Sequence, residues 1–171
     1  MLPGDICDAD TGVTERMDHS IGAISAMTLG QVTFPRFADL REEHPAISRA
    51  IARYERAKIS IQREWTTSLG QRSAIERLSH LFCELFLRME AAGAVDRNSC
   101  DAPLTQTDIA DACGLTPVHV NRTLGELRRE GLVEHSKRRL VIRDLRALMH
   151  RGLFDPGYLH FAAPGATLAN G

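Results

Sequence analysis

The sequence has few aromatic residues, no long hydrophobic run and no strong excess of either charge. Only 5% of its 171 residues are aromatic, and the formal net charge is −1. No stretch approaches the roughly 20 apolar residues of a membrane-spanning helix, and the acidic beginning MLPGDICDAD lacks the apolar core of a signal peptide. With 43% hydrophobic residues the chain can still bury a core. We therefore expect a soluble, cytoplasmic protein that makes no contact with a membrane.

The sequence also lacks the patterns of a disulfide framework, a metal site or a catalytic site. Its four cysteines, Cys7, Cys83, Cys100 and Cys113, form no CxxC pair and have no histidine at ligand spacing. We interpret them as reduced structural thiols, with a redox or metal role as the alternative. The seven histidines do not cluster, and no Ser/His/Asp set, carboxylate pair or phosphate loop is found. We expect no cofactor, no metal and no enzymatic activity.

The small net charge is unevenly distributed along the chain. Residues 1–37 hold two arginines against five acidic residues, whereas residues 104–171 hold nine Lys or Arg against seven Asp or Glu. The C-terminal part is therefore mildly basic, which permits a polyanionic partner without requiring one.

Periodicity divides the chain into segments. In residues 1–36, short apolar runs such as SIGAISAM and GQVTFP alternate with Pro, Gly and Asp, which predicts two or three short strands. Two or three short strands cannot form a stable sheet by themselves, and we therefore interpret this segment as part of a larger unit.

From Pro45 onward, apolar residues recur at intervals of four and three, which is typical of a two-stranded coiled coil. The flanks are charged, so the seam is narrow and favours one partner helix, most simply that of a second copy. The alternative is a helix that lies on the sheet of its own domain. The seam consists of Ile47, Ile51, Tyr54, Lys58, Ile61 and Trp65, with Lys58 as a polar interruption.

Gly70 is expected to end this helix. Ser73 and Glu76 then form a capping box for a second helix with a wide apolar face. VDRNSCDAP after Gly93 is predicted to be a polar loop.

The stretch TQTDIADACGLTPVHVNRTLGELRREG predicts two helices joined by a tight corner. Thr105 and Asp108 suit the start of the first helix, and Gly114 suits the corner. Thr116 caps the second helix, with Pro117 in its first position. This is the pattern of a helix-turn-helix, in which residues 117–130 form the recognition helix and Val120, Leu124 and Leu127 its buried stripe.

The opposite face of the second helix carries the candidate base-reading residues. Arg122 can present two parallel donors to guanine and Asn121 can pair with adenine. His119 and Asn121 are equally compatible with a solvated surface, and for Val118 packing is favoured over contact with a thymine methyl group. After Gly131, two short strands around Ser136 to Arg139 predict a basic wing whose tip would contact phosphates, with a solvated hairpin as the alternative.

The order of these elements, with the motifs LGQRSAIERLSHLFCEL and LTQTDIADACGLTPVHVNRTLGELRREGLV, resembles the Crp/Fnr family of bacterial transcription regulators. The resemblance implies an N-terminal β-roll sensor, a long dimerisation helix and a C-terminal winged helix. Residues 1–37 would then be the remnant of the roll, residues 38–69 the dimerisation helix and residues 70–171 the DNA-binding domain. The first strands of the roll are absent from this sequence.

The resemblance also indicates that this chain does not bind a cyclic nucleotide as its effector. Members that bind one hold it with a glutamate and an Arg-Ser pair, which align here with Ala9 and with His19 and Ser20. Without a carboxylate and a guanidinium, the bidentate grip on the ligand is lost. The cysteine cluster of iron–sulfur members is also absent. A further departure is Val118, which stands where members that read the familiar half-sites carry a glutamate.

The resemblance implies a sequence-specific transcription regulator that binds double-stranded DNA as a homodimer, with RNA polymerase as a further candidate partner. The alternative is a truncated dimerising fragment without effector sensing, which is inert or interferes with a full-length relative. The expected DNA-binding residues are Thr105, Gln106, Thr116, Pro117, Val118, His119, Asn121, Arg122, Lys137 and Arg138.

Overall fold

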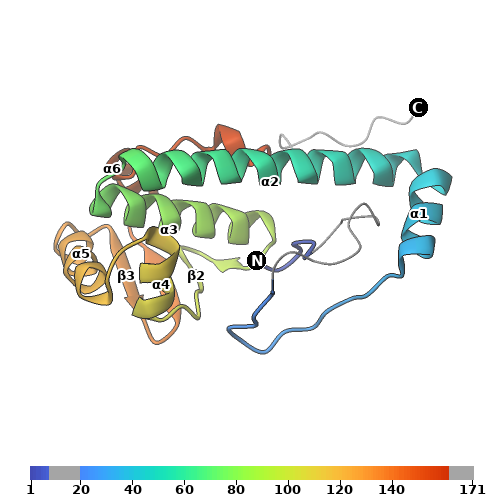
Figure 1. Cartoon of the computed structure of the whole chain (residues 1–171). Helices are drawn as coiled ribbons and strands as arrows, with labels where there is room; N and C mark the ends of the chain where they lie inside the picture. Colours follow the sequence, from blue (N-terminus) through green and yellow to red (C-terminus); the bar gives the residue numbers. More distant parts are fainter. Residues whose placement is uncertain (8–19, 162–171) are drawn as a thin grey trace.

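The computed structural model describes residues 1–7 and 20–161 and shows a mainly helical chain with one small sheet (Figure 1). The helices are α1 (Phe34–Glu43), α2 (Pro45–Gln71), α3 (Ala74–Ala91), α4 (Gln106–Cys113), α5 (Pro117–Arg129), α6 (Leu145–Arg151) and the 3₁₀ turn η1 (Pro156–Leu159). The strands are β1 (Val95–Asp96), β2 (Ser99–Asp101), β3 (Val133–Ser136) and β4 (Arg139–Ile142). The predicted class, mainly α with a small β part, is confirmed. Over the described ranges, no helix combines the length and apolarity needed to cross a bilayer.

The strands predicted in residues 1–36 are not found in the described parts of that segment. Residues 20–33 contain no strand, and apolar side chains such as Ile24 and Leu29 are exposed. A strand requires a neighbour for its backbone groups and a covered face, and neither is present here. The run GQVTFP ends in the first turn of α1, where Pro35 is accommodated because its missing N–H has no helical partner there. Residues 8–19, which include Ala9 and His19, lie outside the described residues.

The long helix α2 crosses the whole molecule and separates α1 at one end from the helix-turn-helix at the other (Figure 1). Helix α2 ends at Gln71, one residue after the predicted stop, so Gly70 lies inside the last turn of the helix. One glycine lowers helix stability by only about 1 kcal/mol, so it need not end a helix. The predicted capping box is confirmed, because Glu76 Oε2 accepts a hydrogen bond from the Ser73 backbone N–H at 2.7 Å.

Helix α3 lies at the centre of the hydrophobic core. Leu78, Phe82 and Cys83 are completely buried, and they belong to one cluster with the inner faces of α4, α5 and the sheet. This packing provides the rigid support on which the helix-turn-helix stands.

The sheet is antiparallel throughout, with strand order β1-β2-β4-β3. The segment VDRNSCDAP, predicted to be a loop, contributes β1 and β2, and Cys100 pairs with Leu140 of β4. The prediction failed because two short strands of mainly polar residues show no alternation, and their stability comes from pairing with β4, about 40 residues later. The extra hairpin widens the sheet behind the wing.

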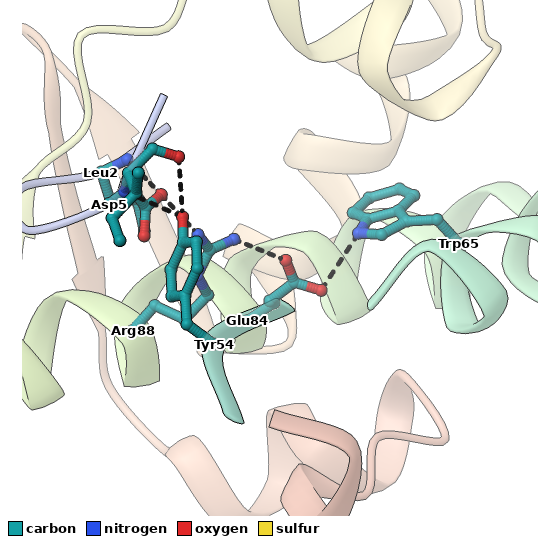
Figure 2. A network of polar contacts seen from close by, with 7 residues as sticks. Leu2, Asp5, Tyr54, Trp65, Glu84 and Arg88 are labelled. Carbon is teal, nitrogen blue, oxygen red and sulfur yellow. Dashed lines mark hydrogen bonds and ion pairs between the residues drawn. The ribbon is translucent and has the colours of Figure 1, made fainter. Parts of the chain in front are cut away.

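A polar network joins the N-terminal residues, α2 and α3 (Figure 2). Asp5 pairs with Arg88 at 2.6 Å, and Arg88 also pairs with Glu84 at 3.1 Å. The Tyr54 hydroxyl accepts from the Ile6 backbone N–H at 2.9 Å and donates to the Ile6 carbonyl at 3.0 Å. Charged hydrogen bonds in partly buried positions are stronger than those on open surfaces. The network therefore attaches residues 1–7 to the two long helices.

A second part of this network contains the buried His80. The Tyr158 hydroxyl donates to Glu84 Oε2 at 2.8 Å, so the ring nitrogen Nε2 of His80, 3.0 Å away, must donate to the Tyr158 oxygen. His80 has an exposed fraction of 0%. Burial, assisted by the charge of Arg72 and opposed by that of Glu64, lowers the pKa of His80 to about 4. His80 is therefore neutral at physiological pH, with its proton on Nε2.

Candidate nucleic-acid interface

The first helix of the motif begins as the sequence predicts. Thr105 Oγ1 accepts from the Asp108 backbone N–H at 3.1 Å, and Asp108 Oδ2 accepts from the Thr105 N–H at 2.7 Å. These two bonds satisfy donors that the first helical turn leaves without partners. The Thr105 hydroxyl also donates to the same carboxylate at 2.7 Å. The cap therefore already uses the hydroxyl of Thr105, one of the expected DNA-binding residues.

The corner between the two helices is built on Gly114 and on an anchor from α3. Gly114 has φ +61°, a left-handed conformation that glycine adopts without steric cost. Arg77 Nη1 of α3 donates to the Cys113 carbonyl at 2.7 Å. This bond satisfies a carbonyl at the end of α4, where no later helical N–H is in reach. The corner is thus held against the core as well as closed by its own backbone.

The second helix, α5, ends at Arg129, within one residue of the predicted boundary. Its start is capped by Thr116 Oγ1, which accepts from the His119 backbone N–H at 3.2 Å. Val120, Leu124 and Leu127 are buried, as predicted. The Thr116 hydroxyl proton has no acceptor among the described residues, so it remains available for a phosphate oxygen.

Four side chains of α5 lie on its exposed face, opposite the buried stripe: Val118, His119, Asn121 and Arg122. Val118 has an exposed fraction of 81%, so the expectation that it packs inside the chain is wrong. Helical spacing places residue 118 four positions before residue 122, which puts the two side chains next to each other. Nothing in the described part of the chain covers this surface.

Two polar contacts order the exposed face. Arg122 Nη2 lies 2.8 Å from His119 Nε2, and Asn121 Nδ2 donates to Gln106 Oε1 of α4 at 3.4 Å. A guanidinium carries only donors, so His119 Nε2 must be the acceptor and the ring proton must be on Nδ1. The periodicity of the sequence shows that these residues share a face, but it does not indicate which of them pair.

The wing is a tight hairpin of β3 and β4. The sequence predicted a turn of four residues from Ser136 to Arg139, but the strands include both of those residues and pair them with each other. Only Lys137 and Arg138 remain in the turn, with φ +48° and +67°. Both are exposed, as a phosphate-contacting tip requires. Arg138 Nη2 donates to the Ile24 carbonyl at 3.4 Å.

The predicted dimer seam on α2 is partly covered by the chain itself. Ile61 and Trp65 pack against the core, Ile51 is buried and Tyr54 bonds to Ile6. The two remaining seam residues are more open, with exposed fractions of 36% for Ile47 and 38% for the Lys58 side chain. The covering elements are α3, η1 and residues 1–7, not the sheet that the alternative interpretation had suggested.

The functional elements match known regulators in sequence. Residues 76–151 match the Crp-like helix-turn-helix domain. The chain is 33% identical over 133 residues to the nitrogen fixation regulation protein FixK of Bradyrhizobium diazoefficiens, which corresponds to 77% of this chain and 54% of that protein. It is 30% identical over 148 residues to FixK of Azorhizobium caulinodans, covering 86% and 59% of the two chains. It is 26% identical over 117 residues to the transcriptional activator protein FnrL of Cereibacter sphaeroides, covering 66% and 47%.

The fold is shared with a solved structure. The structure of FixK2 from Bradyrhizobium japonicum aligns with a TM-score of 0.57 at 21% identity, covering 67% of this chain and 56% of that one. The chain spans about half the length of the curated relatives it matches. The matched part contains the capped helix-turn-helix and the wing described above. Residues 76–151 therefore form a Crp-like helix-turn-helix domain, and the similarity in sequence to FixK and FnrL supports a Crp/Fnr family transcription regulator.

Proposed function

We propose that this protein is a sequence-specific DNA-binding transcription regulator that acts as a homodimer. The observation that carries the proposal is the exposed face of α5, where Arg122 and its neighbours project from a helix whose other face is buried. A helix presented in this way fits the major groove, and Arg122 has the donors to read the O6 and N7 atoms of a guanine.

The second part of the interface is the wing. Lys137 and Arg138 stand together at an exposed hairpin tip and would contact phosphates, with the Thr116 hydroxyl as a third contact. Phosphate contacts supply affinity that is independent of sequence, so they complement base reading by α5. A cytoplasmic location and contact with RNA polymerase belong to the same proposal, because the names of the matched relatives describe regulators and activators of transcription.

The experiment that tests DNA reading is selection of bound duplexes from a random pool, followed by binding assays with Arg122→Ala. The wild-type chain should enrich one half-site, and Arg122→Ala should lose about 1–3 kcal/mol of binding free energy on it and tolerate replacement of one guanine. An unchanged sequence preference in Arg122→Ala would refute the role of Arg122. A wild-type chain that enriches no sequence would refute the regulator function.

Homodimerisation would use the open part of the α2 seam. Lys58→Leu removes the polar interruption and should tighten the dimer, whereas Ile47→Asp places a charge in the seam and should weaken it. Arg56→Leu is the matched control, because Arg56 lies on the exposed flank of the same helix. Sedimentation equilibrium measures all three variants, and equal effects of Lys58→Leu and Arg56→Leu would contradict the seam.

The alternative function is a dimerising fragment that does not sense an effector and interferes with a full-length relative. It is favoured by the exposed apolar side chains of residues 20–33, which no described element covers. This function predicts mixed dimers with a longer relative that fail to activate transcription. A chain that binds an operator and controls a reporter gene without any relative would exclude it.

A further inference from the structure

We propose that His119 is the positioning residue for Arg122, and that Val118 selects a thymine beside the guanine that Arg122 reads. The inference rests on the proposed DNA-binding function and specifies its half-site. Arg122 Nη2 lies 2.8 Å from His119 Nε2 on the exposed face of α5.

The contact leaves Arg122 able to read a base. A guanidinium has five N–H donors, and His119 takes one of them. A guanine needs two, for O6 and N7, so the positions of the remaining donors decide whether Arg122 reads it well. A long arginine side chain loses conformational freedom when it is fixed on a partner. His119 holds one end of the guanidinium before DNA arrives, and this reduces the cost of binding.

The side chain of His119 is free to hold Arg122 because only the backbone of His119 takes part in the hydrogen bonds that stabilise α5. The His119 N–H donates to Thr116 Oγ1 in the helix cap, and the His119 carbonyl accepts from Thr123 Oγ1 at 2.9 Å. Both bonds remain when the side chain is replaced. Variants of the His119 side chain should therefore fold normally.

Val118 supplies the second element of the half-site. It lies one helical turn before Arg122, and with an exposed fraction of 81% it does not contribute to the hydrophobic core. Its two methyl groups cannot accept or donate a hydrogen bond. The only methyl group in the major groove is that of thymine C5, so an apolar side chain next to a guanine-reading arginine favours thymine at the neighbouring position.

The experiment compares His119→Phe with His119→Gln on the half-site selected by the wild-type chain. His119→Phe keeps a planar ring but removes the acceptor, whereas His119→Gln restores an acceptor oxygen. Discrimination for the guanine is the ratio of affinities for the selected site and for a site with that guanine replaced. His119→Phe should reduce this ratio about 2- to 10-fold, the effect of leaving one long side chain unordered, and His119→Gln should recover most of it. The thermal unfolding midpoint should not change in either variant, because the backbone bonds of His119 remain.

The role of Val118 is tested on the same site with Val118→Glu. A carboxylate accepts from the cytosine N4 amino group, so preference at the neighbouring position should move from thymine to cytosine by about tenfold or more. Val118→Ala should reduce discrimination for thymine without creating a preference for cytosine.

The outcomes separate this inference from the proposed function. If the wild-type chain selects no sequence, DNA reading itself fails. If it selects a guanine-containing half-site and His119→Phe keeps full discrimination, the positioning role of His119 is wrong while the regulator function stands. A selected half-site without thymine beside the guanine overturns the role of Val118.

Discussion

The indole Nε1 of Trp65 donates a hydrogen bond to Glu84 Oε2 at 3.0 Å and thereby joins the middle of α3 to the long helix α2 (Figure 2). Glu84 is buried, so the bond replaces water that this carboxylate would otherwise bind. The position of the helix-turn-helix relative to α2 therefore depends on a polar contact as well as on apolar packing.

Replacing Trp65 by phenylalanine tests this contact. The variant keeps most of the aromatic surface but removes the donor, and the free energy of unfolding should fall by about 1–3 kcal/mol, the range for a hydrogen bond to a charged group. Chemical denaturation measures the change. Trp65→Phe combined with Glu84→Gln is the matched control, because the uncharged amide needs the donor less, and equal losses in both backgrounds would contradict the contact.

The buried His80 makes stability depend on pH. The pKa of His80 is about 4 in the folded chain, against 6.5 for an ordinary histidine, so between these values the unfolded chain takes up a proton that the folded chain does not. Stability should be fully present above pH 6.5 and should decline by up to about 3 kcal/mol as the pH falls to 4. The charges of Arg72 and Glu64 act on the His80 ring directly. Glu84 is linked to the ring through the hydroxyl of Tyr158.

Denaturation of the wild-type chain and of His80→Gln at several pH values checks this prediction. The stability of His80→Gln should depend less on pH between 6.5 and 4 than the stability of the wild-type chain does, whatever its absolute stability. Parallel curves for the two proteins would show that another group causes the dependence.

Gly152 allows α6 to approach α3 closely. A Cβ atom at this position would lie 2.8 Å from the His80 backbone nitrogen and 3.0 Å from Ser79 Cβ. Gly152→Ala should therefore destabilise the protein by about 1–3 kcal/mol, because backbone atoms must move. Gly125→Ala is the matched control. Nothing lies within 4 Å of its added methyl group, and it should stabilise α5 by about 0.5–1 kcal/mol. Thermal unfolding of both variants gives the comparison, and a neutral Gly152→Ala would show that α6 can shift.

The wing offers a test that separates folding from DNA binding. Lys137 and Arg138 adopt positive φ values, which asparagine and glycine prefer in a two-residue hairpin turn. The double variant Lys137→Asn, Arg138→Gly should be at least as stable as the wild-type chain. It should bind all DNA sequences more weakly, and the slope of log affinity against log salt should decrease by roughly 1–2, about one for each lost phosphate contact. Binding titrations at several salt concentrations measure this slope, and an unchanged slope would remove the wing from the interface.

Much of the helix-turn-helix was predictable because its determinants are local. The pair Thr105 and Asp108, the corner at Gly114 and the cap at Thr116 each act within one turn of their own position. The buried stripe of α5 follows from helical periodicity in the same way. Two other statements remain predictions. One is the division of the chain into domains at residues 37 and 69, and the other is the set of DNA-binding roles, which depend on a bound duplex.

By itself, the sequence determined where the helices of the DNA-binding motif begin and turn, because capping and periodicity depend on residues three or four positions apart. Only the tertiary structure decided that residues 20–33 form no strand, that β1 and β2 join β4, and that Trp65 and Tyr54 bond within their own chain. It also decided that His119 accepts from Arg122 while Val118 stays exposed. These features depend on contacts between distant segments or on the choice of one side-chain partner among several, and no spacing along the chain specifies them.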